Sequence, residues 1–551
     1  MPREEIPAPR NPDRLPKLCG ADIELGNFIL GRGRPGGSVR EASQALLREI
    51  DAPYARTEAA RAGTAYNPQD WGRKYLSSNG SCAYIDLDHL ELALPEVLSA
   101  YDHVAAWHAM LRVTQRALAA ANAKLPSDQT LYALANNSDG RDHAYGSHLN
   151  FLVTRRAWDD IFERRMHHLL VLAAFQVSSI VMTGAGKVGA ENGRPDVAYQ
   201  LSQRADFFET VVGPETTHHR PIVNSRDEPL CGPWTAALTP ETPSASMARL
   251  HCIFFDSTLC HGSSLLRVGP MQLLLGLLEA DLVNPELILD DPVAAVVTWS
   301  HDPTLAARVR MASGARLTAV ELQLRFLEDA QRFAATGGFN GLVPHADKIL
   351  ALWEDTLARL HAGDVAGLAS RLDWALKLHI LERALASRPG LTWTDTAIKH
   401  LDHLYASVDP ETGLYWAYER AGAVERLVSD AEIEKLVHEP PEDTRAWGRA
   451  NLLRIGAGQV QDVDWDRIRF RQGGGYWPTL RTIALDDPLG FTRAAIEPVI
   501  EAAGSLDDVL DALGATTATA GTTPGALAWP QLAPPANGGP YPPRRDDDEY
   551  A

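Results

Sequence analysis

Apolar and polar residues alternate along several short stretches of the chain, a pattern that predicts β-strands with one buried face. The clearest stretch is 82–88, CAYIDLD. One side of it carries Ala83, Ile85 and Leu87, and the other carries Cys82, Tyr84, Asp86 and Asp88. We therefore predict a half-buried strand over 82–88 with two carboxylates on its polar side.

Longer stretches have the helical period. Between residues 96 and 124, apolar residues recur at spacings of three, four and seven, which predicts an amphipathic helix. Residues 318–387 are also helical in pattern, with a break marked by Gly337, Gly338 and Pro344. The apolar run 177–182 is interpreted as a strand. Because the predicted strands are hairpin-like neighbours without regular βαβ alternation, the expected fold class is α+β with an antiparallel sheet.

The two ends of the chain differ in composition from its middle. Residues 1–17 are polar and Pro-rich and predict a flexible leader without a secretory signal, while 516–551 are rich in Ala, Thr, Gly and Pro and predict a disordered tail. Between them we expect a larger domain over 18–391 and a small C-terminal domain over 392–515. The longest apolar run, 169–182, is shorter than the ~18 residues that a membrane-spanning helix needs.

Charge and cysteine content narrow the class of protein. The 551 residues include 52 basic and 71 acidic ones, a formal net charge of −19, which argues against nucleic acid or an anionic membrane as the partner. The five cysteines form no CxxC pair and are too few for a disulfide scaffold. We interpret them as reduced thiols and expect a cytoplasmic protein.

One glycine motif is a weak candidate for nucleotide binding. Gly184, Gly186 and Gly189 match the GxGxxG spacing, but a dinucleotide site needs a helix directly after it. The following residues, AENGRPDVAY, contain Gly193 and Pro195 and do not begin a helix. We therefore expect no Rossmann site here, although a glycine-rich turn beside a nucleotide stays open.

Paired carboxylates are a stronger chemical signal. Asp22 and Glu24 are two residues apart, as are Asp86 and Asp88, so on strands each pair points to one side. Oxygen ligands that converge in this way suit Mg²⁺, which bridges protein carboxylates and substrate phosphates. The alternative is an ordinary solvated strand face.

Two further groups of polar residues could take part in the same site. The turn-rich stretch 136–150 contains His148, which is either a metal ligand or a structural histidine. Arg204, Arg220 and Arg226 lie in two nearby blocks. Guanidinium groups fit phosphate oxygens bidentately, so these arginines are candidates for binding a triphosphate, with surface salt bridges as the alternative.

Six blocks of the sequence together resemble the Pup ligase/depupylase family, the proteasome accessory factor A enzymes and their deamidase relatives among the glutamine-synthetase-like carboxylate–amine ligases. The blocks are GADIELG, WGRKYLSSNGSCAYIDLDHLELALPEV, ANNSDGRDHAYGSHLNFLVTR, YQLSQRADFFETVVGPETTHHRPIVNSRDEP, RLHCIFFDSTLCHGSSLLRVG and LVHEPPEDTRAWGRANLL. They span almost the whole of the chain between its two ends. The resemblance implies a curved antiparallel sheet that cradles ATP and Mg²⁺, backed by helices and closed by a small C-terminal domain.

The resemblance also implies roles for individual residues. Asp86 falls on the family's catalytic base or nucleophile. The implied metal ligands are Asp22, Glu24, Glu91 and His148. Arg204, in QLSQRADFFE, and Arg226, in RPIVNSRDEP, match arginines of the family. Arg445 matches a nucleotide-contacting arginine of the small domain.

The implied reaction transfers the γ-phosphoryl of ATP to a carboxylate, which an amine then attacks. By analogy the donor is the C-terminal glutamate of a Pup-like modifier and the acceptor is a lysine of a target protein. The same site could instead cleave an amide, as in a depupylase or deamidase, or the chain could be a degenerate nucleotide- or modifier-binding protein. Trp71-Gly72-Arg73, ahead of the Asn79-Gly80 turn, is ligase-like, and we favour the ligase.

Three positions depart from the family pattern. Leu149 follows His148 where the family commonly has glutamate, His261 replaces a carboxylate, and Asp22 stands where glutamate is usual. The other carboxylates are present, so we still expect an active enzyme, with the number of metal ions left open.

Overall fold

The computed structural model describes residues 14–31, 39–52, 72–232, 246–473 and 479–519. Most of the expected leader and tail, residues 1–13 and 520–551, therefore lies outside the described residues. The parts that are described correct both ends. Lys17 is fully buried in an ion pair with Glu279 (2.6 Å), and residues 516–519 form a strand, so the predicted flexible segments are too long.

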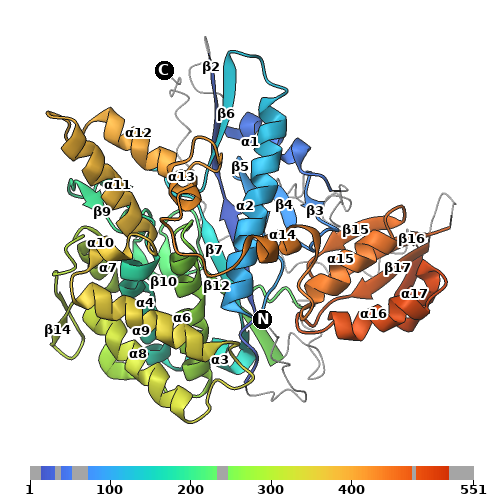
Figure 1. Ribbon diagram of the computed structural model, residues 1–551. Helices are drawn as coiled ribbons and strands as arrows, with labels where there is room; N and C mark the ends of the chain where they lie inside the picture. The colour runs from blue at the N-terminus through green and yellow to red at the C-terminus, as the bar shows by residue number, and fades with distance from the viewer. Residues whose placement is uncertain (1–13, 32–38, 53–71, 233–245, 474–478, 520–551) are drawn as a thin grey trace, which may run out of the picture.

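A six-stranded sheet at the centre of the molecule carries the polar residues of interest (Figure 1). Its strands follow the order β12-β7-β1-β5-β4-β3, and every neighbouring pair is antiparallel. The bounds are β12 Met247–Cys252, β7 Ser147–Thr154, β1 Cys19–Glu24, β5 His89–Ala93, β4 Cys82–Asp86 and β3 Lys74–Tyr75. The antiparallel α+β prediction is confirmed.

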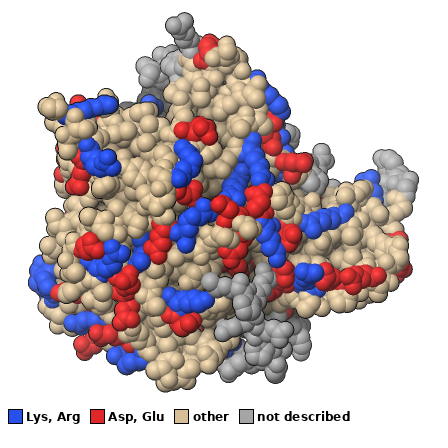
Figure 2. Space-filling model, in the orientation of Figure 1, with Lys and Arg blue, Asp and Glu red and all other residues tan. Residues whose placement is uncertain are grey.

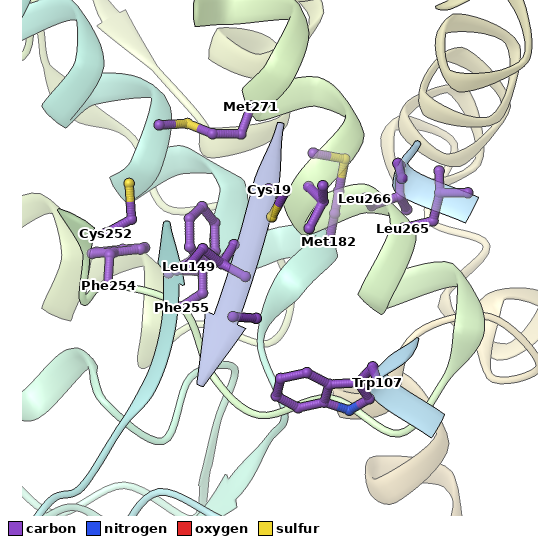
Figure 3. Packing of buried hydrophobic residues seen from close by; sticks show 14 of the residues in the cluster. Cys19, Trp107, Leu149, Met182, Cys252, Phe254, Phe255, Leu265, Leu266 and Met271 are labelled. Atoms are coloured by element: carbon purple, nitrogen blue, oxygen red, sulfur yellow. The ribbon is translucent and has the colours of Figure 1, made fainter. Parts of the chain in front are cut away.

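The two faces of this sheet differ because side chains alternate along each strand. Cys19, Leu149 and Cys252 lie on the apolar face, packed with Phe254, Phe255 and Met271 (Figure 3). The helices α2 (Ala100–Asn122) and α6 (His261–Glu279) contact this face. The opposite face carries the carboxylates, so one sheet joins the hydrophobic core to the candidate site.

Helices build the layer behind the sheet. The predicted helix over 96–124 is α2, which begins after Ser99, whose hydroxyl accepts a hydrogen bond from the Tyr101 amide. The predicted break in 318–387 is also present. The helices there are α8 Ala319–Ala335, α9 Ala346–His361, α10 Val365–Leu368 and α11 Asp373–Ser387.

The strand interpretation of 177–182 is wrong, because this run is the end of α4 (Met166–Thr183). An apolar run that is buried all round has no period that separates a core strand from a core helix. This helix is also long and apolar enough to cross a membrane by composition alone, but 83% of it is buried inside the protein. Such burial is typical of a core helix.

The central sheet and the elements up to residue 438 form the larger body of the protein. Its remaining elements are short. They are β2 Gly26–Gly31, α1 Val39–Glu49, β6 Gln129–Leu134, α3 Arg155–Asp159, β8 Lys187–Val188, β9 Tyr199–Gln200, β10 Thr210–Gly213, β11 Pro221–Asn224, α7 Pro292–Ser300, β13 Val309–Arg310, β14 Arg316–Leu317, α12 Thr396–Tyr405, α13 Leu414–Arg420 and α14 Asp430–His438. β2 and β6 form a two-stranded ribbon that projects beyond the sheet (Figure 1).

A second, smaller core lies mainly in residues 445–519, the C-terminal unit, drawn in orange to red in Figure 1, and also includes Tyr75, Cys82, Tyr84 and Ala93 of the central sheet. Its sheet has the order β15-β16-β17-β18. The elements are α15 Arg445–Ile455, β15 Val460–Asp464, β16 Arg467–Gln472, β17 Thr479–Ala484, α16 Arg493–Ala502, α17 Leu506–Ala512 and β18 Thr516–Thr519. Within the region expected to form the small domain, Ile398 to Val437 pack in the first core and Leu452 to Leu510 in the second.

Charged side chains of both signs are mixed over the surface that Figure 2 shows. On α2, for example, Arg112 contacts Asp430 and Glu434 of α14, and Arg116 contacts Glu434. Exposed pairs of this kind contribute little to stability, typically below about 1 kcal/mol. They leave no broad basic patch among the described residues on this face.

Candidate functional site

The strand register brings residues from four parts of the sequence together on the polar face of the sheet. Asp22 on β1 lies opposite His148 on β7, and Glu24 on β1 lies opposite Glu91 on β5. Tyr84 on β4 is the next neighbour of Glu91. Because facing residues of paired strands point to the same side, their polar atoms converge.

Two overlapping groups of potential metal ligands result. Asp22, Glu91 and His148 form one, and Glu24, Asp86 and Glu91 form the other, with the ligand atoms of each group within 4.8 Å of one another. Glu91 belongs to both. The structure thus brings together all four predicted metal ligands and the predicted base, Asp86.

Hydrogen bonds hold the carboxylates in place. The Tyr84 hydroxyl donates to Glu91 Oε1 (2.6 Å), and the Gly146 amide donates to Glu24 Oε2 (2.8 Å). Asn150 Nδ2 donates to Asp22 Oδ2 (3.0 Å). These contacts fix oxygen positions that would otherwise be free to rotate, as supporting residues do at metal sites.

The turn between β4 and β5 decides which acidic residue reaches the site. Leu87 and Asp88 both have positive φ, 42° and 73°, so a tight two-residue turn follows Asp86. Asp88 therefore leaves the sheet and lies in solvent, with its side chain 58% exposed and 3.7 Å from Arg40. The predicted strand over 82–88 ends at Asp86, and the expected pairing of Asp88 with Asp86 on one face is wrong.

Burial and mutual repulsion disfavour the charged forms of these carboxyl groups. Burial raises the pKa of Asp22 to about 6 and also raises the pKa of Glu24. Burial, with the adjacent Glu24, raises the pKa of Glu91 well above its usual range. In contrast, burial and the positive charge of Arg204 hold the pKa of His148 well below its usual range. Keeping these three buried carboxyl groups ionised costs folding free energy unless a cation compensates their charge.

Close approach of the backbone is needed beside the first strand. A Cβ atom on Gly146 would clash with the Glu24 carboxylate and the His148 imidazole. Gly146 is therefore required by space and not by its φ angle.

The predicted arginines occupy different parts of the site. Arg204 is fully buried and donates to the Tyr145 carbonyl (2.6 Å), and burial next to Arg220 lowers its pKa to about 9. Arg220 donates to the carbonyls of Thr216 and Ala144 (3.0 and 2.9 Å). Arg226 is 40% exposed, 4.0 Å from Glu228.

Arg445 lies at the far end, in the first turn of α15, where it forms an ion pair with Glu96 (2.8 Å). Arg449, one turn later, forms an ion pair with the same carboxylate (2.5 Å). The two arginines hold the pKa of Glu96 at about 2 despite its burial. This contact ties the C-terminal unit to the larger body.

A cavity of about 400 Å³ opens between the polar face of the sheet and the C-terminal unit. Asp22, Tyr84 and Arg445 line it, together with Trp465. Its wall also contains Asn150 and Arg249, which the sequence reasoning did not select, and Arg73, which it named only as part of a ligase-like motif.

Two of the residues that sequence reasoning missed are on β12. Arg249 Nη1 donates to Asn150 Oδ1 (2.8 Å), and the His251 ring lies 5.0 Å from that of His148. Both could have been found, because Arg249 and His251 are two apart in a strand-like stretch and so share a face. Arg73, whose guanidinium carbon lies 4.1 Å from the centre of the Tyr84 ring, belongs to a motif that the family resemblance singled out, but no local pattern places it at this site.

The departures from the family pattern do not remove a group from this cluster. Leu149 points to the apolar face, where it is fully buried (Figure 3). His261 lies at the start of α6, with its ring 4.4 Å from that of His108 and tilted by 49°. Gly184 follows the end of α4, and β8 comes next where a dinucleotide site needs a helix, so these glycines are not flanked by the strand and helix of a dinucleotide site.

Comparisons with known proteins agree with this architecture. The model of a family described as Pup-ligase protein matches residues 39–469. A depupylase of Acidothermus cellulolyticus is 35% identical over 439 residues, 80% of this chain and 83% of that protein. A Pup–protein ligase of Acidimicrobium ferrooxidans is 33% identical over 492 residues, 88% of this chain and 98% of that protein.

Two solved structures share the fold. One is the complex between the prokaryotic ubiquitin-like protein Pup and its ligase PafA, with a TM-score of 0.73, 23% identity and 91% of each chain covered. The other is the Pup ligase PafA in complex with ADP, with a TM-score of 0.68, 25% identity, and 84% of this chain and 97% of that chain covered.

Proposed function

The chain belongs to the Pup-ligase family, and we propose that it is an ATP- and Mg²⁺-dependent ligase that joins a carboxylate of a Pup-like modifier to a lysine of a target protein. The observation that supports this most is the pair of ligand groups that share Glu91 on one sheet face. A carboxylate is a poor electrophile, so phosphorylation by ATP must precede its reaction with an amine.

The residues present fit a magnesium site. Asp22, Glu24 and Glu91 offer the hard oxygen ligands that Mg²⁺ prefers, and His148 adds a nitrogen. The raised pKa values of the three carboxyl groups indicate that the cluster needs positive charge. When bound, Mg²⁺ would neutralise charge on the phosphates.

Arginines would bind the anionic substrates. Arg204 and Arg220 lie close enough to Glu24 for their charges to affect it, so a phosphoryl group beside Glu24 would meet two buried cations. Arg249 and Arg445 line the cavity together with Asp22. We propose that ATP occupies this cavity, in keeping with the ADP complex of the related ligase, and that Arg226 acts at its exposed rim.

Asp86 is the proposed base. An attacking lysine is protonated near neutral pH, so a group at the site must take its proton. Asp86 ends β4 and is partly exposed, whereas Glu24 and Glu91 are buried, so an incoming amine reaches Asp86 most easily. Free, buried cysteines fit the reducing cytoplasm that we propose as the location.

Conjugation with purified components tests this function. We expect ADP release and a modifier–lysine conjugate only when ATP, Mg²⁺, a Pup protein ending in glutamate and a lysine-bearing acceptor are all present. Asp86→Asn should abolish the conjugate, while Asp88→Asn, the exposed neighbour, serves as the matched control and should retain activity. Equal activity of wild type and Asp86→Asn would overturn the assignment of the base.

Hydrolysis of the same bond is the second candidate, favoured by the 35% identity with a depupylase. With water in place of the lysine, the same carboxylates could serve an amide-cleaving reaction. A preformed modifier–lysine conjugate separates the two candidates. A hydrolase cleaves it with little net ATP consumption, whereas a ligase consumes one ATP for each bond that it forms.

A further inference from the structure

A second cluster of potential metal-ligating side chains lies outside the candidate site on the polar face of the central sheet. His167 and His168 are in the first turn of α4, and Asp281 follows α6 by two residues. The potential ligand atoms of these three residues lie within 4.8 Å of one another. His168 Nε2 is 3.0 Å from Asp281 Oδ1, and the two imidazole rings are 4.5 Å apart at nearly a right angle.

The cluster is anchored on one side and open on the other. The side chain of His168 is only 1% exposed, while that of Asp281 is 47% exposed. Arg165 Nη1 contacts Asp281 Oδ2 (2.6 Å) and so fixes the carboxylate while leaving Oδ1 directed at His168. Supporting contacts of this kind orient the ligands of many metal sites. Solvent can complete the coordination sphere from the exposed side.

We propose that His167, His168 and Asp281 bind a transition-metal dication of the Zn²⁺ type. Two imidazoles and one carboxylate suit Zn²⁺, Ni²⁺ or Cu²⁺ and do not suit Mg²⁺, which prefers oxygen ligands. The site is therefore chemically different from the carboxylate cluster on the polar face of the central sheet. Because its ligands come from the start of α4 and the end of α6, a bound ion would also fasten these two core helices together.

Zinc titration of the full-length protein tests the site. Saturating Mg²⁺ and a non-hydrolysable ATP analogue are present to occupy the candidate site on the central sheet. Bound Zn²⁺ is measured by competition with a chromophoric chelator. We expect one Zn²⁺ per chain, with affinity at least about tenfold weaker in His167→Gln, since loss of even a supporting partner has an effect of that size. His167 is partly exposed, so this variant should fold, and its unfolding temperature without Zn²⁺ checks that.

The matched control is His218→Gln, which alters another adjacent histidine pair, His218 and His219, at the surface. This control should keep the wild-type Zn²⁺ affinity and the rise in unfolding temperature that Zn²⁺ produces. With Cu²⁺ as the probe, electron paramagnetic resonance should show coupling to imidazole nitrogen in the control and reduced coupling in His167→Gln. Absence of bound Zn²⁺ in the wild type, or equal affinity in the two variants, would overturn the proposal.

Discussion

Replacement of Asp22 by asparagine should stabilise the metal-free protein at the expense of its function. Asp22 is packed with Glu24 and Glu91 on the polar face, and burial raises its pKa to about 6 from an ordinary value of 3.8. An asparagine has nearly the same shape. Its amide oxygen can still accept the hydrogen bond from Asn150 Nδ2. The substitution therefore removes mainly the charge.

The magnitude follows from the two pKa values. Each unit corresponds to about 1.4 kcal/mol, so ionised Asp22 costs up to about 3 kcal/mol of folding free energy above the pKa of about 6. The cost is absent below the ordinary value of 3.8, where Asp22 is protonated in both states, and it grows as the pH rises between the two values. Water in the cavity screens the partly exposed carboxylate and reduces the effect.

Urea unfolding in the presence of a chelator measures this effect. At about pH 7.5 we expect Asp22→Asn to be more stable than wild type, and at about pH 4 we expect the two proteins to be nearly equal. Asp88→Asn, in the exposed turn, is the control and should match wild type at both pH values. Added Mg²⁺ should stabilise wild type more than Asp22→Asn. A variant that is less stable than wild type without metal at the higher pH would refute the reasoning.

Two other substitutions probe the neighbouring contacts. Glu96→Gln removes the charge that holds Arg445 and Arg449, and loss of one partner from a buried ion pair should lower the free energy of unfolding by about 3 kcal/mol in urea, so a change below about 1 kcal/mol would contradict the role of this contact. Gly146→Ala should retain the fold by circular dichroism but lose most conjugating activity, because the added methyl group displaces Glu24; full activity would show that the close approach is not needed.

The polar side of β4 was predictable because alternation within one strand is a local property of the sequence. Asp86 and Tyr84 could therefore be assigned to one face of β4, and Asp22 and Glu24 to one face of β1. Their meeting depends on the pairing of β1 with β5 and β7, which joins residues more than sixty positions apart, and only the family resemblance predicted it. The turn at Asp88 shows the limit of alternation, since period alone does not say where a strand ends.

The other wrong or missing predictions also concern features that a short stretch of sequence does not determine. The end of α4 has the sequence pattern of a buried strand because a fully buried segment shows no amphipathic period. The role of Leu149 was also not visible from the sequence, since the face on which it lies follows from the register of β7 with β1 and β12. Arg249 could have been selected from its alternation with His251, whereas its contact with Asn150 crosses between two strands and does not follow from either strand alone.

Transfer of oxygen from the donor carboxylate to phosphate tests the central claim most directly. If ATP activates the carboxylate as an acyl phosphate, attack by the lysine releases phosphate that keeps one carboxylate oxygen. A Pup protein labelled with ¹⁸O at both carboxylates of its C-terminal glutamate should therefore yield one ¹⁸O in each phosphate released during conjugation, as detected by mass spectrometry. Conjugation that releases only unlabelled phosphate would contradict the account.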